Sequence, residues 1–525
     1  MVKTLNSNSK FLLLLIFIVV FRTIVWALFM PLWHFPDEQA HFSQISLFVE
    51  TGKMLPYPDF LSQDTSKEIV TSEELLGTSR DWAGNNKFTY HPEYNIQYSQ
   101  TTIGPYEKDI VLPSVDDRKT FVKKEATSYP PLYYILASIP YRMVYSSDLL
   151  TRVFAVRLAN IVFSVLLVLF CYKLFRSIFP KNQILVYTAT ILVAFQPMLT
   201  FVSSGINSDN LFNLVFSAGI YLSFSLLKKK YSVTKILLLI GLLFVAVQTK
   251  PQGIILVYVY LIPVIVQVMR SRYRWFLSGL GLVFLFIPGV MIATRASQGH
   301  QILPDVALAG LSLPALTFWD HLRWSLSHTY REVMPWYWGV FKWLGLVLPR
   351  PINRVINWLM VISLFGLLLY TIEIIKKRYY HKLFCLFYLA YIPIGYFLIL
   401  TFWDFLFTRG KGFSIGIQGR YFFPILPVHM ALVILGLGVF NSNQRIKVLI
   451  TKILGLGMMV LNSYAFWYVL SSYYDRYHIV NFFLQASQYK PWFAKSPYLE
   501  SWLILYSVVL LSFIYRYIKM PSKHL

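Results

Sequence analysis

Two adjacent carboxylates and a histidine follow the first apolar segment of the chain. The stretch reads Trp33-His34-Phe35-Pro36-Asp37-Glu38-Gln39-Ala40-His41-Phe42. A carboxylate can accept a proton from a substrate hydroxyl, and a nearby imidazole can orient that carboxylate or act as a second acid. Pro36 suits the first position of a helix, so we expect Asp37 and Glu38 in its first turn and Asp37 and His41 on one face. The alternative is that the two acids only cap an interfacial helix that ends near Glu50.

The composition predicts an all-α polytopic membrane protein. Hydrophobic residues make up 56% of the chain, aromatic residues 18% and charged residues only 14%, and the mean hydropathy is +0.53. These values exclude an ordinary soluble protein. The net charge of +24 does not indicate nucleic acid as a partner, because the basic residues form short clusters between apolar segments. Cys171 and Cys385 lie within apolar segments, so no disulfide framework and no cysteine-based zinc site is encoded.

The apolar segments long enough to cross a bilayer number about twelve. They cover residues 11–30, 153–178, 184–201, 211–227, 236–249, 253–269, 276–294, 355–375, 383–402, 421–440, 448–470 and 502–518. Lys3 and Lys10 precede the first segment as in a signal peptide, but the apolar run is long and no small-residue cleavage site follows. We therefore expect this segment to remain as an anchor.

The positions of basic residues predict the orientation in the cell membrane. Clusters of Lys and Arg occupy every second connection, which is typical of cytoplasmic loops and places both termini in the cytoplasm. The remaining connections, which include residues 31–152, 295–354, 403–420 and 471–501, are expected outside. Of the 24 acidic residues, 16 lie between Pro31 and Arg152, so chemistry is expected in the first outside loop.

This topology divides the chain into five regions. The sequence predicts a cytoplasmic N-terminus and first span over 1–30, a large first outside loop with interfacial helices over 31–152, spans two to seven over 153–294, an outside loop over 295–354, and spans eight to twelve over 355–525. Within the first loop, residues 51–128 lack a long apolar period and predict an irregular segment, and Tyr129-Pro130-Pro131 leads into a surface helix of about ten residues.

Polar residues also gather at the expected outer ends of other spans. They are Arg157, Asn160, Asn207, Asp209, Lys250, Gln418, Arg420 and Tyr421. Taken singly, each has a structural interpretation, since Asn207 and Asp209 can cap a helix and the cations can contact lipid phosphates. Together on one side with Asp37, they predict a pocket for an anionic, lipid-linked substrate and a hydroxyl acceptor. Arg22, within the first span, is the deepest charge.

Several of these stretches resemble, in the same order, the signatures of a bacterial and archaeal group of predicted membrane glycosyltransferases with a Pro-Pro-Asp-Glu-x-x-His motif. They are residues 33–42, Tyr129-Pro130-Pro131-Leu132-Tyr133-Tyr134, Arg157-Leu158-Ala159-Asn160, Asn207-Ser208-Asp209 and Gln418-Gly419-Arg420-Tyr421. That group is similar to the GT-C superfamily, which includes protein mannosyltransferases and aminoarabinose transferases. The match extends from the first span to the tenth, and Phe35 replaces the first proline of the motif.

The resemblance implies a GT-C-like membrane bundle that transfers a hexosyl or pentosyl group, with inversion, from a polyprenyl-phosphate donor on the extracytoplasmic face. Asp37 matches the acid thought to act as catalytic base, with Glu38 beside it, and Glu38 or His41 is expected to orient it. Tyr129, Arg157, Asn160, Asn207, Asp209, Gln418, Arg420 and Tyr421 match positions that would line the donor site. Arg420, with Lys250 or Arg157, is expected to bind the phosphate.

The sequence leaves a metal and two other functions open. Asp37, Glu38 and His41 are acceptable ligand types for a divalent ion, but no second histidine-rich cluster accompanies them, so we expect no required cofactor. The first alternative is a lipid flippase or transporter with Arg22, Asp209 and Lys250 along its path. The second is a polymerase or ligase that moves a preassembled glycan between lipid carriers.

Overall fold

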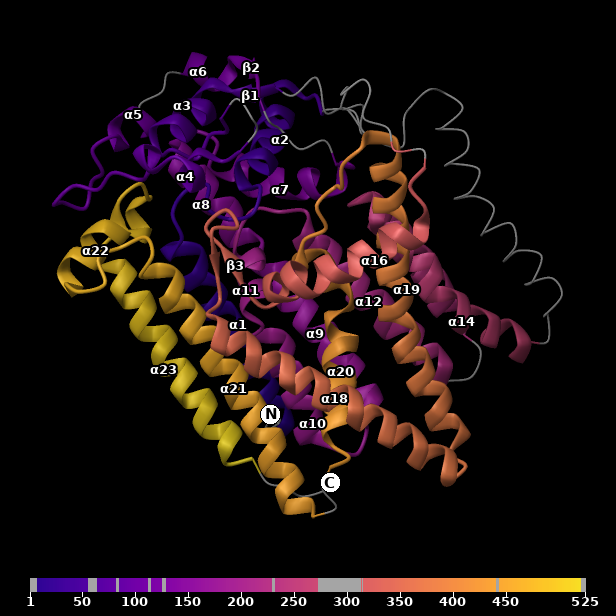
Figure 1. Cartoon of the computed structure of the whole chain (residues 1–525). Coiled ribbons are helices and arrows are strands. Elements are labelled where there is room, and N and C mark those ends of the chain that lie inside the picture. The colour runs from indigo at the N-terminus through magenta and orange to yellow at the C-terminus, as the bar shows by residue number, and fades with distance from the viewer. Residues whose placement is uncertain are drawn as a thin grey trace.

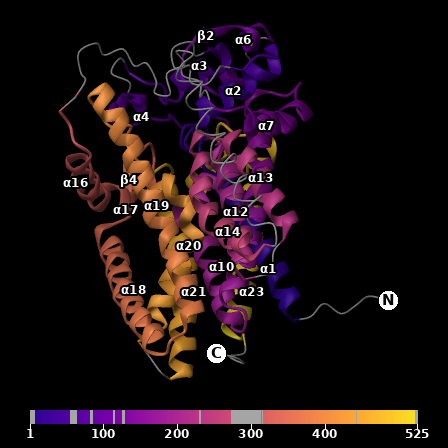
Figure 2. The same ribbon diagram turned by 90° about the vertical axis from the view of Figure 1, so that its right-hand side faces the viewer.

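The structure is a computed structural model that describes residues 7–54, 64–81, 85–111, 115–124, 129–228, 232–271, 313, 315–440 and 443–520. Within these residues the chain forms a helical bundle whose one end is covered by a smaller group of short elements (Figure 1). We call this group the cap and define it as the described residues between Glu38 and Asp148. Helix α1 begins and α23 ends at the opposite end of the bundle (Figures 1 and 2).

The described residues contain nine helical segments long and apolar enough to cross a membrane. They are α1 (Ser7–Phe29), α8 (Leu149–Ala159) continued by α9 (Ile161–Ile178), α12 (Asp209–Lys228), η2 (Pro251–Ile254) continued by α14 (Ile255–Arg270), α18 (Arg350–Lys376), α19 (Tyr380–Lys411), η4 (Gly419–Ile425) continued by α20 (Leu426–Leu437), α21 (Gln444–Leu470) and α23 (Tyr498–Ile518). The prediction of a polytopic all-α membrane protein is confirmed.

The tenth segment is broken. Helices α10 (Gln183–Ala194) and α11 (Pro197–Ser204) meet at an angle of 57° and count as one further span only if taken together. Pro197 cannot continue the hydrogen bonding of α10, and Gln196 caps the new helix by accepting from the Leu199 amide. The expected span 236–249 forms the shorter helix α13 (Val233–Val247), and the expected span 276–294 lies outside the described residues. The count of twelve stays a prediction.

Close helix contacts in the bundle depend on small residues. Helices α18 and α20 cross at Gly366 and Gly436, where a Cβ atom on Gly366 would lie 2.1 Å from the Gly436 carbonyl oxygen. Such contacts replace the hydrophobic driving force that is missing between helices in lipid. Arg22 is buried in α1 with its guanidinium carbon 5.5 Å from the Phe195 ring centroid.

The cap consists of short helices and one two-stranded sheet. The elements are α2 (Glu38–Thr51), β1 (Asp64–Ser66), α3 (Lys67–Leu75), α4 (Lys87–Tyr90), η1 (Pro92–Tyr94), α5 (Glu107–Val111), α6 (Val115–Lys119), β2 (Phe121–Lys123) and α7 (Leu132–Met143). Strands β1 and β2 pair antiparallel, with Asp64 opposite Lys123. Two ion pairs fasten the cap, one of Arg118 with Glu50 and one of the buried side chains of Arg152 and Glu68, both at 2.6 Å. The first pair joins two parts of the cap, and the second ties Glu68 of the cap to Arg152 of α8 in the bundle.

The remaining elements lie between the cap and the bundle or beside them. They are α16 (Phe318–His328), the π-helix η3 (Thr329–Val333), α17 (Met334–Trp338), β3 (Val340–Phe341), β4 (Leu346–Val347), α22 (Ile479–Ser487) and η5 (Trp492–Ala494). Strands β3 and β4 form a hairpin in which Val340 pairs with Val347.

Candidate active site

The acidic motif occupies a tight loop between α1 and α2. Asp37 is the N-cap of α2, and its φ of 54° places it in the left-handed region, which aspartate tolerates better than most residues. The expectation that Pro36 starts the helix and Asp37 lies in its first turn is therefore wrong, because the chain turns at Asp37 and α2 begins at Glu38. The helix itself ends at Thr51, close to the expected Glu50.

The turn between α11 and α12 holds this loop in place. Asn207, in the turn between α11 and α12, donates from Nδ2 to the Pro36 carbonyl oxygen at 2.9 Å. Gly205 leaves room for the loop, since a Cβ atom there would lie 2.4 Å from Cβ of Phe35. Asn160, between α8 and α9, donates to the Gly205 carbonyl oxygen at 2.9 Å. The two predicted asparagines thus position the acidic loop through its backbone and its neighbouring turn.

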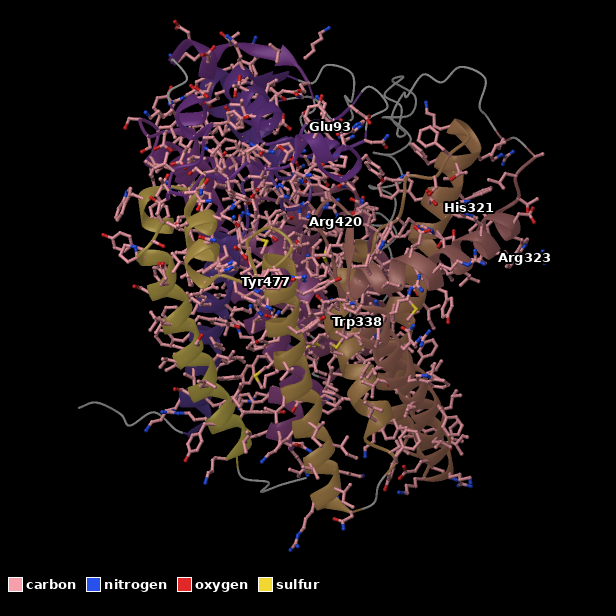
Figure 3. All side chains as sticks on the ribbon, turned by 60° about the vertical axis from the view of Figure 1, so that its left-hand side comes forward. Glu93, His321, Arg323, Trp338, Arg420 and Tyr477 are labelled. Atoms are coloured by element: carbon pink, nitrogen blue, oxygen red, sulfur yellow. The ribbon has the colours of Figure 1, made fainter. Side chains whose placement is uncertain are left out.

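Asp37 pairs with Arg420, which lies 383 residues further along the chain. Nη2 of Arg420 is 2.5 Å from an oxygen of Asp37, and the side chains are 5% and 35% exposed, respectively. Figure 3 places Arg420 inside the molecule, below the cap and above Trp338. Within the described residues, Nε and Nη1 of Arg420 are buried and have no hydrogen-bond partner. A buried cation with two unused donors is suited to bind an anion.

Electrostatics keeps the Asp37 carboxylate ionised. Burial on its own would favour the neutral acid, but the charge of Arg420 and its hydrogen bond outweigh burial and lower the pKa of Asp37 to about 2. Burial lowers the pKa of His41 to about 3, so this imidazole is neutral at physiological pH. Its Nδ1 lies 3.0 Å from the Tyr134 hydroxyl.

Glu38 points away from Asp37 and forms a different ion pair. Both of its oxygens accept from Arg157, the closer pair of atoms at 2.6 Å, and neither side chain is exposed. Arg157 also donates to the carbonyl oxygens of Ala27, Met30 and Pro31 at 2.8–3.1 Å. Every nitrogen of this guanidinium has a partner, so Arg157 ties α8 to the end of α1 and the start of α2.

A second buried pair of predicted residues lies near the first. Asp209, at the start of α12, forms an ion pair with Lys250, and the Lys250 ammonium lies 4.8 Å from the Tyr129 ring centroid. Burial and the charges of Asp209 and Asp37 raise the pKa of Tyr129. Asp37, Asp209, Lys250 and Arg420 all act electrostatically on His41. Residues from the first loop, α12, the α13–η2 connection and η4 therefore converge.

The turn before Arg420 is fixed by a buried carboxylate of α19. Asp404 accepts from the Ser414 hydroxyl at 2.9 Å and from the Ile415 amide at 2.8 Å, and Nε2 of His321 in α16 lies 3.0 Å away. Glycine at 419 lets η4 approach α17, because a Cβ atom there would lie 2.2 Å from the Tyr337 nitrogen. These contacts set the position of the following Arg420.

A cavity of about 240 Å³ opens beside the Asp37–Arg420 pair. Its lining residues come from the acidic loop, the cap, α11, the β3–β4 hairpin and the turn before η4. They are His34, Phe35, Pro36, Asp37, Arg80, Asn85, Asn86, Tyr90, Met198, Phe201, Val340, Phe341, Trp343, Leu344, Gln418 and Arg420. Of the predicted residues, Asp37, Gln418 and Arg420 line this cavity. Tyr421 follows Arg420, and its ring centroid lies 5.6 Å from the guanidinium carbon.

Sequence reasoning missed several lining residues. His34 belongs to the acidic stretch, and its position three residues before Asp37 was a usable signal. Arg80 and Asn86 come from the irregular part of the first loop and are joined by an isolated β-bridge. Arg80 adds a second positive charge that acts on Asp37. No periodicity distinguishes these residues in the sequence.

The arrangement of the motif does not fit a metal site. Asp37 faces Arg420, Glu38 faces Arg157 and His41 faces Tyr134, so the three expected ligand types diverge. Across the part of the chain that the structure describes, no group of three His, Cys, Asp or Glu side chains is placed to hold a metal ion.

The fold and site define a polytopic membrane protein with a charged cavity under an irregular cap. Residues 20–429 match the family described as "Predicted membrane protein (DUF2142)". The match covers most of the sequence, and the chain belongs to this family. No curated protein matches the chain.

Three solved structures are similar to the chain at 12% sequence identity. ArnT from Cupriavidus metallidurans in the apo state aligns with 98% of this chain and 77% of its own, with a TM-score of 0.41. The same protein bound to undecaprenyl phosphate gives 96%, 77% and 0.40. The Archaeoglobus fulgidus oligosaccharyltransferase in the apo form gives 88%, 56% and 0.43.

Proposed function

We propose that this protein is a GT-C-type glycosyltransferase that moves one sugar from a polyprenyl-phosphate donor to a hydroxyl acceptor, with inversion. The observation that carries the proposal is the pairing of Asp37 with the buried Arg420, two nitrogens of which have no partner among the described residues, beside a cavity at the cap end of the bundle. A carboxylate and an anion-binding cation are the two groups that this reaction requires.

Asp37 is proposed as the general base. It takes the proton of the acceptor hydroxyl while the acceptor oxygen attacks the anomeric carbon, and the bond from that carbon to the phosphate oxygen breaks. Polyprenyl phosphate leaves with the bonding electron pair. Such proton transfer is typically worth about 10² to 10⁴ in rate. A single displacement requires only one base, so the reaction does not require Glu38, and its role is structural.

Arg420 is proposed to bind the donor phosphate and to stabilise the charge that develops on it. Its buried guanidinium is preorganised by η4 and has Nε and Nη1 without partners in the described residues. Fixed donors of this kind act strongly where water is excluded. The Lys250–Asp209 pair lies nearby, and both of its charges act electrostatically on His41.

Donor binding is proposed to activate the base. While Arg420 is paired with Asp37, the pKa of Asp37 is about 2, and so acidic a group accepts a proton poorly. When a phosphate competes for the guanidinium, the carboxylate loses part of that stabilisation and burial raises its pKa. The base would then gain strength only with the donor in place, which limits unproductive chemistry.

The proposed donor carries a single sugar. A volume of about 240 Å³ is below the roughly 300–1,000 Å³ of sites for drug-sized ligands, and it suits one sugar ring better than a preassembled glycan. The basic clusters of the sequence support an orientation in the cell membrane with the cap outside and both termini in the cytoplasm. The acceptor would then approach the cavity from the outer face.

Release of undecaprenyl phosphate from undecaprenyl-phosphate-linked monosaccharides tests the proposal. Purified protein is incubated with a panel of such lipids and an envelope extract as the source of acceptor. The wild type should release undecaprenyl phosphate, and Asp37→Asn should lower the rate by about 10² to 10⁴. Asp148→Asn, which changes only the N-cap of α8, is the matched control and should keep the wild-type rate. Equal rates in wild type and Asp37→Asn would refute Asp37 as the base, and lipid movement without release would favour a flippase.

A further inference from the structure

Two residues that line the cavity, besides Asp37 and Arg420, carry buried polar atoms without a partner. Within the described residues, Nε2 of His34 and Oδ1 of Asn86 are buried and have no hydrogen-bond partner. His34 is 1% exposed and Asn86 is 8% exposed, and both line the cavity. A buried polar atom without a partner is costly, and its presence in a cavity wall indicates that a ligand or water completes it.

The contacts of His34 define which of its nitrogens carries the proton. Its Nδ1 lies 2.9 Å from the Tyr473 hydroxyl. Because Nδ1 is the acceptor that the described residues offer to this buried hydroxyl hydrogen, we assign Tyr473 as the donor and Nδ1 as the acceptor. Burial, with the charges of Lys342 and Arg157, lowers the pKa of His34, and the imidazole is therefore neutral. A neutral imidazole that accepts at Nδ1 carries its hydrogen on Nε2, which becomes a donor.

The contacts of Asn86 define the opposite character. Its Nδ2 donates to the Thr78 carbonyl oxygen at 2.8 Å, which fixes the orientation of the amide. Oδ1 is therefore the free atom and is an acceptor. The rings of Phe88 and Tyr473 pack against His34 at centroid distances of 4.4 and 4.8 Å and hold the imidazole in place.

We propose that His34 and Asn86 form a hydroxyl-recognition subsite for the sugar ring of the donor. His34 donates from Nε2 to one ring hydroxyl oxygen, and a second ring hydroxyl donates to Oδ1 of Asn86. The inference rests on the proposed function, because it assumes that the donor phosphate lies at Arg420 in the same cavity. A neutral donor and a neutral acceptor match the hydroxyl groups of a polyhydroxylated ring.

The subsite would set specificity. A buried polar group left unpaired by the wrong hydroxyl configuration costs more than a lost hydrogen bond, so sites of this kind discriminate between closely related ligands. His34 comes from the acidic loop and Asn86 from the segment before α4, whose Phe88 packs on the His34 ring. Only a ring whose hydroxyls reach both satisfies them at once.

Binding measurements with and without the sugar test the inference. The probes are undecaprenyl phosphate and undecaprenyl-phosphate-linked monosaccharides of gluco, galacto, manno and arabino configuration, measured on the full-length protein. The wild type should bind one of the sugar-linked lipids more tightly than undecaprenyl phosphate. His34→Phe, which keeps an aromatic ring between Phe88 and Tyr473, should reduce this difference by roughly tenfold and leave the affinity for undecaprenyl phosphate unchanged.

A second variant keeps the test valid if His34→Phe does not fold. Tyr473→Phe removes the hydrogen-bond partner of Nδ1, so the imidazole of His34 is held less firmly, and the preference for the sugar-linked lipid should also fall. His478→Phe is the control, since the His478 side chain is 72% exposed and does not line the cavity. It should bind all the lipids as the wild type does.

The outcomes separate this inference from the proposed function. A wild type that releases undecaprenyl phosphate but binds no sugar-linked lipid more tightly than undecaprenyl phosphate overturns the subsite and leaves the transferase proposal standing. An undiminished preference in His34→Phe and in Tyr473→Phe also overturns the subsite. A wild type that neither binds nor turns over any of these lipids overturns both.

Discussion

Asp37 and Glu38 are adjacent in the sequence, but their side chains lie in two different regions of the molecule. Asp37 is 35% exposed, lines a cavity and faces Arg420, whose Nε and Nη1 have no partner in the part of the chain that the structure describes. Glu38 is fully buried and faces Arg157, whose nitrogens are all occupied. The difference teaches that an acidic pair in a sequence need not act as a pair. One acid is available for chemistry, and the other fixes the loop that presents it.

The largest effect should come from Glu38→Gln, which leaves the Arg157 charge buried without a carboxylate. Breaking one partner of a buried ion pair typically costs about 3–5 kcal/mol. We expect a marked fall in the thermal unfolding midpoint of the purified protein, measured in lipid nanodiscs. Asp37→Asn should lower it less, because the Asp37 side chain is 35% exposed and its pair with Arg420 lines a cavity, whereas the Glu38–Arg157 pair is fully buried.

The double variant Glu38→Met/Arg157→Met sharpens this comparison. Removing both charges avoids the uncompensated cation and should recover a large part of the lost stability. If Glu38→Gln unfolds at the wild-type temperature, the structural role of the pair is wrong and the division between the two acids disappears.

Asp404→Asn should have an intermediate effect, and this effect should fall on donor binding in the cavity. The substitution weakens the bonds from Ser414 and Ile415 and the contact with His321, so the turn before Arg420 becomes less fixed. We expect KM for the donor to rise roughly tenfold, at a cost of about 1–3 kcal/mol for buried polar groups left short of a partner. A fall in kcat without a change in KM would contradict this positioning role.

The smallest predicted effect is a displacement between two pH profiles. The base must be ionised, and its pKa of about 2 in the free protein puts the acidic limb of kcat/KM at low pH. In the donor complex the phosphate shares Arg420, so the pKa of Asp37 rises and the acidic limb of kcat moves to higher pH. Coincident limbs would show that the donor does not disturb the Asp37–Arg420 pair.

The sequence predicted most of the membrane helices in the described residues, because apolar runs are local signals, and it singled out Asp37, Gln418 and Arg420, which line the cavity. Long apolar runs mark the spans. The motifs that contain Asp37, Asn207 and Arg420 were assigned to the same side of the membrane, and charged residues of these motifs lie close together in the structure. The left-handed turn at Asp37 was not predictable, since Pro36 is equally compatible with a helix start.

Long-range pairing accounts for the rest that the sequence did not reveal. Glu38 and Arg157 are 119 residues apart, and nothing in the sequence of either segment shows that they form a buried ion pair. His34 and Asn86 become cavity residues only because the cap folds over the acidic loop. Irregular segments such as 64–124 carry no period from which a position can be inferred.

The affinity of Asp37→Asn for undecaprenyl phosphate is the most direct test of the central claim that Asp37 and the donor phosphate share Arg420. Removing the carboxylate charge frees the guanidinium, so the variant should bind this lipid about tenfold more tightly than the wild type, or about 1.4 kcal/mol, while losing turnover. The comparison requires only the two purified proteins and titration with the lipid. Equal or weaker binding by Asp37→Asn would show that Asp37 and the donor phosphate do not compete for Arg420.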